Sequence, residues 1–108
     1  MSDYNNFLQD IEAVVKGEQV TAVAWLADRG EDYYGYSRPK YHYSTDWEAV
    51  KFLFDYEYNT GYGGVDCHAI LIWTVSRIIF VQEYDGATDV QSLPLSFINM
   101  KPDDVRFV

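Results

Sequence analysis

Two apolar runs decide how this chain folds: HAILIW at residues 68–73 and IIFV at residues 78–81. Both are rich in residues that favour extended structure, so both predict β-strands. The first run is apolar on both of its faces, which predicts a central strand that is covered on each side. Residues 74–77 supply the turn between the runs, and the second strand is expected to continue to Tyr84.

A third strand is expected after a strong turn signal. Asp85-Gly86 lies between two β-prone runs and predicts a tight hairpin turn. Residues 90–95 should form the returning strand, and Pro94 places it at a sheet edge because proline has no backbone N–H to donate. The alternation of Val105 and Phe107 could add a short last strand.

An amphipathic helix is predicted at residues 3–16, with Ser2 or Asp3 as its cap and Gly17 as its stop. Its apolar side chains recur at helical spacing and should form one buried stripe. The stripe consists of Phe7, Leu8, Ile11, Val14 and Val15.

A second helix is predicted at residues 45–58. Thr45 and Glu48 form the T-x-x-E pattern of a capping box, in which each residue satisfies a free backbone N–H of the first turn. The buried stripe of this helix should consist of Trp47, Val50, Leu53 and Phe54.

The segment between these helices has two interpretations. Residues 18–29 contain three alanines and precede Gly30, which favours a helix, but the alternation of Thr21, Val23 and Trp25 also fits a strand. Residues 30–44 are punctuated by glycine and proline, which predicts a loop or a short irregular hairpin.

These elements predict one α+β domain spanning residues 1–108, with two to three helices packed on one side of a three- or four-stranded antiparallel sheet. There is no run of about 18 apolar residues, so no membrane-spanning helix is expected. The polar N-terminus does not resemble a secretory signal. A single cysteine, Cys67, is typical of a reducing cytoplasm, which would be the host cell's if the protein is phage-encoded.

The charge of the chain restricts its partners. Seventeen acidic and eight basic residues leave a net charge of −9. Such a field repels nucleic acid and anionic lipid and attracts cationic surfaces, so we expect a basic protein partner rather than direct nucleic-acid or membrane binding. The ten tyrosines exceed what a small core needs, which is typical of protein-binding surfaces.

The sequence predicts no catalytic or metal centre. Cys67 and His68 are adjacent, and neighbours on a strand point to opposite faces, so they could not share one ion or form a nucleophile pair. His42 lies far from both in the sequence, and no G-x-S-x-G pattern is present. The Gly61–Gly64 loop lacks the lysine of a phosphate cradle. We therefore expect a protein that is not an enzyme and uses no cofactor.

An acidic, tyrosine-rich surface remains as the candidate site, contributed by segments 31–43 and 55–66. Its carboxylates would pair with arginine and its phenol rings would stack on guanidinium groups. The candidate partner-binding residues are Glu31, Asp32, Tyr33, Tyr34, Tyr36, Asp55, Tyr56, Glu57, Tyr58, Tyr62 and Asp66.

In size and charge the chain resembles the small acidic phage-encoded inhibitors, anti-CRISPR and anti-restriction proteins, that mimic the charge of DNA. No motif carries this resemblance, so no site residue is transferred. It implies a non-catalytic inhibitor that occupies a basic groove on a nuclease or CRISPR effector. The alternatives are an immunity protein for a bacterial toxin, a small ligand-sequestering domain or enzyme, and a homodimer or larger homo-oligomer that pairs through the edge strand near Pro94.

Overall fold

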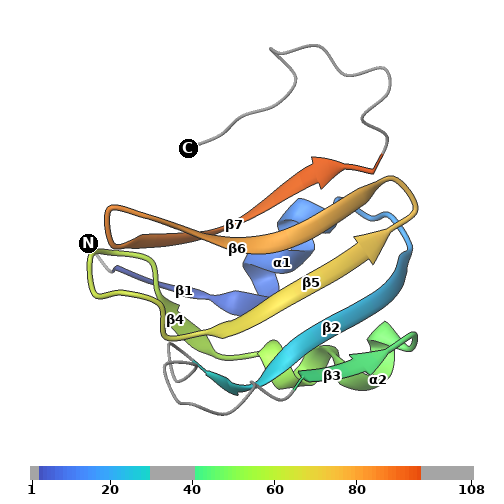
Figure 1. The fold of residues 1–108 in the computed structure, drawn as a ribbon, viewed down its shortest axis with the longest axis horizontal. Helices are drawn as coiled ribbons and strands as arrows, with labels where there is room; N and C mark the ends of the chain where they lie inside the picture. Colours follow the sequence, from blue (N-terminus) through green and yellow to red (C-terminus); the bar gives the residue numbers. More distant parts are fainter. Residues whose placement is uncertain (1–2, 30–40, 96–108) are drawn as a thin grey trace.

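The computed structural model describes residues 3–29 and 41–95 of the chain. They form an antiparallel five-stranded sheet of order β3-β2-β5-β6-β7 and a small two-stranded sheet, β1-β4. Figure 1 shows α1 behind β5 and β6 of the larger sheet. The elements are β1 (Tyr4–Asn6), α1 (Phe7–Val15), β2 (Val20–Arg29), β3 (Tyr41–Ser44), α2 (Trp47–Val50), the 3-10 helix η2 (Lys51–Phe54), β4 (Glu57–Asn59), β5 (His68–Thr74), β6 (Arg77–Tyr84) and β7 (Ala87–Pro94).

The predicted α+β class is confirmed, but the sheet is larger than the expected three or four strands. Within the described residues the helical part is smaller than expected, since α1 and α2 are both short. No helix in this part of the chain is long and apolar enough to cross a membrane. Residues 30–40 and the expected last strand at Val105 and Phe107 lie outside the described residues.

The hairpin of β6 and β7 agrees closely with its sequence signal. Asp85 and Gly86 both have positive φ angles, 52° and 85°, as a two-residue type I′ turn requires. Because Tyr84 pairs directly with Ala87, β7 begins immediately after the turn rather than at Val90. Pro94 lies on the outermost strand, as its missing N–H predicts.

The prediction that β5 is central is confirmed, whereas the prediction that it is covered on both faces is wrong. Ile70, Ile72 and Thr74 are buried, but Leu71 between them is 43% exposed. The strand lies in the middle of the sheet order, yet α1 covers only one face. The apolar run therefore predicted the central position of the strand correctly, but it did not show how many of the strand's faces are covered.

Residues 20–29 form strand β2, so of the two interpretations of residues 18–29 the strand is confirmed and the favoured helix is wrong. Val23 pairs with Ile72 on one side and with Ser44 on the other, and its side chain is fully buried. Two neighbouring strands satisfy the backbone of β2 along both edges. These long-range pairs outweigh the small helix preference of its alanines. Part of the segment 30–44 is also extended, because β3 pairs with β2 as an antiparallel partner.

The helix predicted at 45–58 is also wrong in its second half. α2 and η2 end at Phe54, and the chain then extends into β4. The carbonyl of Tyr56 accepts a 2.8 Å hydrogen bond from the backbone N of Phe7, and Tyr58 pairs with Asn5 of β1. Pairing with the N-terminal strand replaces the hydrogen bonds that a longer helix would have made.

α1 is shorter than predicted but has the expected buried stripe, with Phe7, Ile11 and Val15 in the core. Because the residues before it pair as β1, the helix is capped by Asn6, whose side chain accepts from the backbone N of Gln9 at 2.9 Å. Asp3 does not have this role, and Ser2 lies outside the described residues. The helix presses its stripe against one face of the sheet and thereby builds the core.

Candidate functional site

The structure describes only part of the surface that the sequence predicts. Glu31, Asp32, Tyr33, Tyr34 and Tyr36 lie outside the described residues. Two other tyrosines of the same predicted segment lie on β3 and are strongly exposed, Tyr41 and Tyr43.

The second predicted segment, 55–66, divides between surface and interior. Asp55 and Glu57 are exposed, and the ring of Tyr62 is 81% exposed. Asp66 is half-buried and accepts a 2.8 Å hydrogen bond from the backbone N of Asn59. Its carboxylate therefore stabilises the connection between β4 and β5 and is only partly available to a partner.

Tyr58 belongs to the core and not to the predicted surface. It is 1% exposed, and its ring packs 5.0 Å from the ring of Phe7. Its hydroxyl donates a 2.6 Å hydrogen bond to Oδ2 of Asp10 on α1. Burial, together with the nearby Asp10 carboxylate, raises the pKa of Tyr58 far above that of a free phenol. The side chain is not accessible to a partner.

Tyr56 forms a half-buried network with its neighbours. Its hydroxyl accepts from the backbone N of His68 at 2.8 Å and lies 2.7 Å from Nδ1 of the same histidine. The guanidinium carbon of Arg29 lies 3.7 Å from the ring centroid, as in a cation–π contact. Burial raises the pKa of Tyr56 to about 12, so the hydroxyl keeps its proton. The guanidinium group of Arg29 therefore already occupies one face of the Tyr56 ring.

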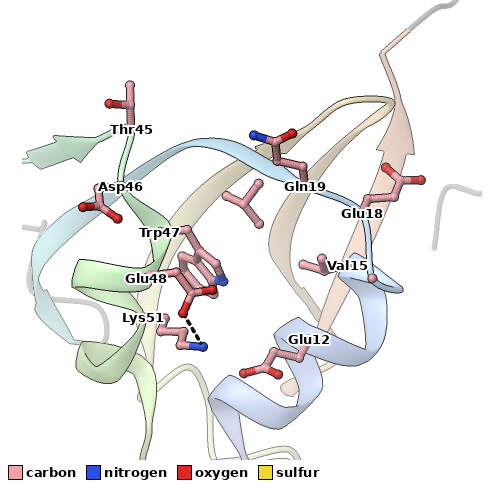
Figure 2. Close-up of a pocket in the computed structure, with 11 residues that line it drawn as sticks. Glu12, Val15, Glu18, Gln19, Thr45, Asp46, Trp47, Glu48 and Lys51 are labelled. Carbon is pink, nitrogen blue, oxygen red and sulfur yellow. Dashed lines mark ion pairs between the residues drawn. The ribbon is translucent and has the colours of Figure 1, made fainter.

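The described residues form an acidic pocket that the sequence did not predict (Figure 2). It has a volume of about 410 Å³ and opens between α1 and the segment that carries α2. It is lined by Glu12, Val15, Gly17, Glu18, Gln19, Val20, Thr45, Asp46, Trp47, Glu48 and Lys51. Four of these side chains are carboxylates and one is an ammonium group, so the lining is strongly negative.

Glu18 is held in place at one side of this acidic pocket. Its Oε1 accepts from the hydroxyls of Thr74 and Ser76, both at 2.7 Å, and Oε2 accepts from Ser76 at 2.8 Å. These hydroxyls lower the pKa of Glu18 below its usual value of 4.5, with Ser76 as the largest cause. The carboxylate is therefore charged at neutral pH and fixed in orientation.

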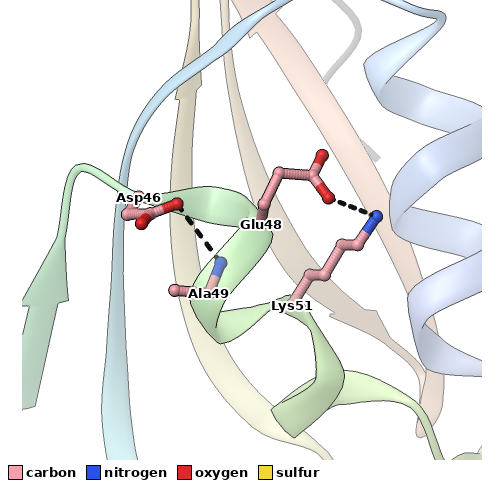
Figure 3. Close-up of polar contacts among 4 residues, drawn as sticks. All are labelled: Asp46, Glu48, Ala49 and Lys51. Carbon is pink, nitrogen blue, oxygen red and sulfur yellow. Dashed lines mark hydrogen bonds and ion pairs between the residues drawn. The ribbon is translucent and has the colours of Figure 1, made fainter.

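The α2 side of the acidic pocket carries two further fixed acids (Figure 3). Asp46 caps α2, and its Oδ1 accepts from the backbone N of Ala49 at 3.3 Å. Glu48 forms a 2.8 Å ion pair with Lys51, which raises the pKa of Lys51. The Glu48 side chain remains largely exposed, so it can still contact a ligand.

Trp47 supplies the aromatic wall of the acidic pocket, as Figure 2 shows. Its ring stacks on the ring of the buried Phe54, with centroids 5.9 Å apart and planes 16° apart. This stacking holds the indole in the lining of the pocket, together with Glu12 and Glu48, and leaves it half-buried. Anionic groups around an indole form an environment that suits a guanidinium or an alkylammonium group.

The acidic pocket could not be predicted from the sequence, because the residues that line it come from segments that are far apart in the chain. Glu12 and Glu18 flank the end of α1, whereas Asp46 and Glu48 flank Trp47 at the start of α2. The one local signal is the motif Asp46-Trp47-Glu48, in which a large aromatic residue lies between two acids. Nothing in the sequence shows which second acidic segment faces it.

The cysteine and the two histidines each have separate surroundings in the described residues. Cys67 is fully buried, and this burial raises the pKa of its thiol to about 12. Nδ1 of His68 is engaged with Tyr56, and His42 packs against the ring of Trp25. Across 3–29 and 41–95, no group of three or more His, Cys, Asp or Glu residues is placed to hold a metal ion.

A second hollow of about 340 Å³ lies beside β7. Its lining includes Asp10, Asp89 and Thr88, and the hydroxyl of Thr88 is buried without a hydrogen-bond partner. Asp10 already accepts from both Tyr58 and Asn5, which leaves less of its carboxylate for a ligand.

No protein-family model matches the chain, and neither the curated proteins nor the solved structures include a significant match. The geometry of these hollows and the charge of the chain therefore carry the functional argument. Of the two hollows, the acidic pocket has the larger volume, the larger excess of carboxylates and an accessible indole.

Proposed function

We propose that this protein is a non-catalytic acidic inhibitor that binds a basic groove of a nucleic-acid-processing protein, as anti-CRISPR and anti-restriction proteins do, by partial mimicry of DNA charge. The acidic pocket around Trp47 is the observation that supports this most directly. Basic grooves that bind DNA are lined by arginine and lysine. An arginine from such a groove would find carboxylates for its five donors and an indole for its planar face.

The overall charge supports the same proposal at longer range. A net charge of −9 attracts a cationic surface before contact and raises the association rate. The exposed Asp55, Glu57 and Tyr62 offer carboxylate and phenol groups outside the pocket for additional contacts. An immunity protein for a toxin nuclease would use the same chemistry, and the identity of the inhibited enzyme separates the two cases.

A non-catalytic role agrees with the environment of the reactive groups. The Cys67 thiol keeps its proton in the core, and His68 is oriented by Tyr56 rather than toward the acidic pocket's lining. The carboxylates of Glu18 and Asp46 are already held by hydrogen bonds, which suits a binding role.

The proposal is tested by measuring DNA cleavage by purified CRISPR effectors and restriction endonucleases with increasing amounts of this protein. We expect inhibition that is lost as DNA is added in excess, and that weakens roughly tenfold or more between low and high salt, because the attraction is screened. Inhibition that is insensitive to salt would contradict charge mimicry. Failure to inhibit any such enzyme would contradict the proposed function.

The contribution of the acidic pocket is measured with the double variant Glu12→Gln/Glu48→Gln. We expect roughly thirtyfold weaker inhibition, since each substitution removes the charge that strengthens a hydrogen bond to a cationic partner, which is worth about 1 kcal/mol per residue. The matched control is Glu83→Gln/Asp85→Asn, which removes the same charge from exposed positions in the β6–β7 hairpin. Equal weakening by the two double variants would show that net charge acts without the pocket.

A small ligand-sequestering domain is the second candidate function. It is supported by the hollow beside β7, where the unpartnered Thr88 hydroxyl could bond a ligand and Asp89 could pair with an amine. In that case a small amine, rather than a protein, would raise the midpoint temperature of unfolding.

A further inference from the structure

Two neighbouring rows of side chains on the face of the large sheet that points away from α1 carry no charge. The next row toward the β6–β7 turn carries one, Asp89, whose carboxylate accepts a 2.8 Å hydrogen bond from Gln91. Residues paired in register point to the same face of a sheet. Val23, Ile72 and Ile79 form a row of register partners, and all three are fully buried on the helix side. The rows on either side of it must therefore point to the opposite face, which we call the open face.

The first row of the open face crosses all five strands. It runs from Tyr43 on β3 through Ala24, Leu71 and Phe80 to Gln91 on β7. Tyr43 is strongly exposed, and Leu71 is exposed at the centre of the sheet. No residue of this row carries a formal charge.

The second row repeats the pattern on four strands. Ala22, Trp73, Ile78 and Leu93 are register partners, and none is charged. Trp73, Ile78 and Leu93 are half-buried, yet they are not among the partly buried side chains that pack against the core. As register partners they lie side by side on the open face, and each keeps part of its surface exposed to solvent.

We propose that the open face is a homodimer interface, in which the sheets of two copies of this chain pack face to face as an intermolecular β-sandwich. A contiguous apolar face of this kind is rare on a monomer and marks an interaction surface. A second copy fits because it presents the same uncharged rows, so a two-fold axis through the centre of the face buries no charge from either row. Sheets stacked in this way lie about 10 Å apart.

The size of the open face suits a dimer. Neighbouring strands lie about 4.8 Å apart and rise about 3.3 Å per residue, so five strands of this length cover roughly 500–600 Å². The strands counted are β5 with seven residues and β6 and β7 with eight each, together with β2 and part of β3. Two copies packed over the full length of these strands would bury about 1,000 Å², with Asp89 inside this footprint toward the β6–β7 turn, and this is the area that a specific interface needs.

The charge of the chain gives this dimer a distinctive salt dependence. Two copies that each carry −9 repel one another at long range, while the open face itself adds no charge in its two rows. Salt screens the repulsion and strengthens apolar association. Dimerisation should therefore tighten with salt, whereas binding of a basic partner should weaken. The two proposals fail independently of one another.

The dimer would leave the acidic pocket free. The pocket is built from α1, α2 and the residues that follow α1, and α1 packs on the opposite side of the sheet from the open face. A face-to-face dimer would therefore carry one accessible acidic pocket on each copy, directed away from the interface.

Sedimentation velocity of the whole chain, in a dilution series at low and high sodium chloride, tests this proposal. We expect a species of twice the 12.5 kDa chain mass whose dissociation constant falls with salt. Leu71→Glu places two unpaired carboxylates at the centre of the interface and should weaken dimerisation by roughly 100-fold or more. Tyr43→Glu, in the same row but at the edge strand, should weaken it less.

The matched control is Val75→Glu, which introduces the same charge at an exposed apolar residue in the β5–β6 turn, outside both rows. It should dimerise like the wild type. Circular dichroism and the midpoint temperature of unfolding check that each variant is folded. If the wild-type chain stays monomeric in high salt at its highest soluble concentration, the proposal is wrong. The open face would then have some other partner or none. A dimer that survives both Leu71→Glu and Tyr43→Glu overturns it as well.

Discussion

Tyr58 and Tyr62 belong to one short segment of similar composition, yet their surroundings differ completely. Tyr58 lies in β4, and the pairing of β4 with β1 directs its ring into the core, where Asp10 accepts its hydroxyl. Tyr62 lies in the glycine-rich connection to β5 and is almost fully exposed. The number of tyrosines in a segment therefore overstates the phenol surface that it can offer to a partner.

Removing the hydroxyl of Tyr58 should destabilise the fold. Tyr58→Phe keeps the packed ring but deletes a 2.6 Å hydrogen bond to a carboxylate, which is expected to cost about 1.5–3 kcal/mol of unfolding free energy. Urea denaturation monitored by fluorescence measures the change. Tyr62→Phe is the control and should alter stability by less than about 0.5 kcal/mol. Equal effects of the two variants would show that the Tyr58–Asp10 bond contributes nothing in solution.

Among the elements, α2 shows how a cap can be misassigned by one position. The pattern Thr45-x-x-Glu48 predicts a capping box, but the residue that caps the helix is Asp46, and Glu48 pairs with Lys51 instead. Asp46 also receives support from Ser44, whose hydroxyl accepts from the backbone N of Asp46 at 3.0 Å. Acidic and hydroxyl residues both cap helices, so a run that contains both does not identify the cap.

Exchange of the two candidate caps for alanine distinguishes these assignments. Asp46→Ala should lower the unfolding free energy by about 1 kcal/mol, because the backbone N of Ala49 loses its acceptor. Thr45→Ala should change it by less than about 0.5 kcal/mol. Thermal and urea unfolding of both variants provide the comparison. A larger loss for Thr45→Ala would contradict the cap seen in the structure.

Over the whole molecule, the two faces of the sheet have different roles. One face carries α1 and the core, and the helix layer on this side forms the acidic pocket. The open face carries uncharged rows. Glu18 links the layers, because it follows α1 and accepts from Thr74 and Ser76 at the β5–β6 turn. Its carboxylate contributes both to the fold and to the charge of the pocket.

The stability that Glu18 contributes should depend on pH. Its pKa is lowered in the folded state, so its contribution is fully present above the usual value of 4.5 and is lost as pH falls through the lower folded pKa. The difference in midpoint temperature between wild type and Glu18→Gln should therefore be largest near neutral pH and shrink below pH 4.5. Glu12→Gln controls for the loss of one negative charge. A difference that is constant with pH would contradict this role.

Local sequence patterns by themselves determined the α+β class, the buried stripe of α1, strands β5 and β6 and the Asp85-Gly86 turn. Each of these features depends on residues only a few positions apart, through side-chain spacing or positive φ angles. The local pattern is therefore enough to predict them. The charge of −9 likewise follows from composition alone.

Only the tertiary structure decided that residues 20–29 are a strand, that Tyr58 is buried and that no helix within residues 3–29 and 41–95 covers the second face of the sheet. β2 has a weak local preference and becomes extended because β3 and β5 satisfy its backbone on both sides. The acidic pocket likewise requires α1 and α2 to meet, although they are far apart in the chain. Local propensities are worth fractions of a kcal/mol per residue, so contacts between distant segments decide wherever the local signals are balanced.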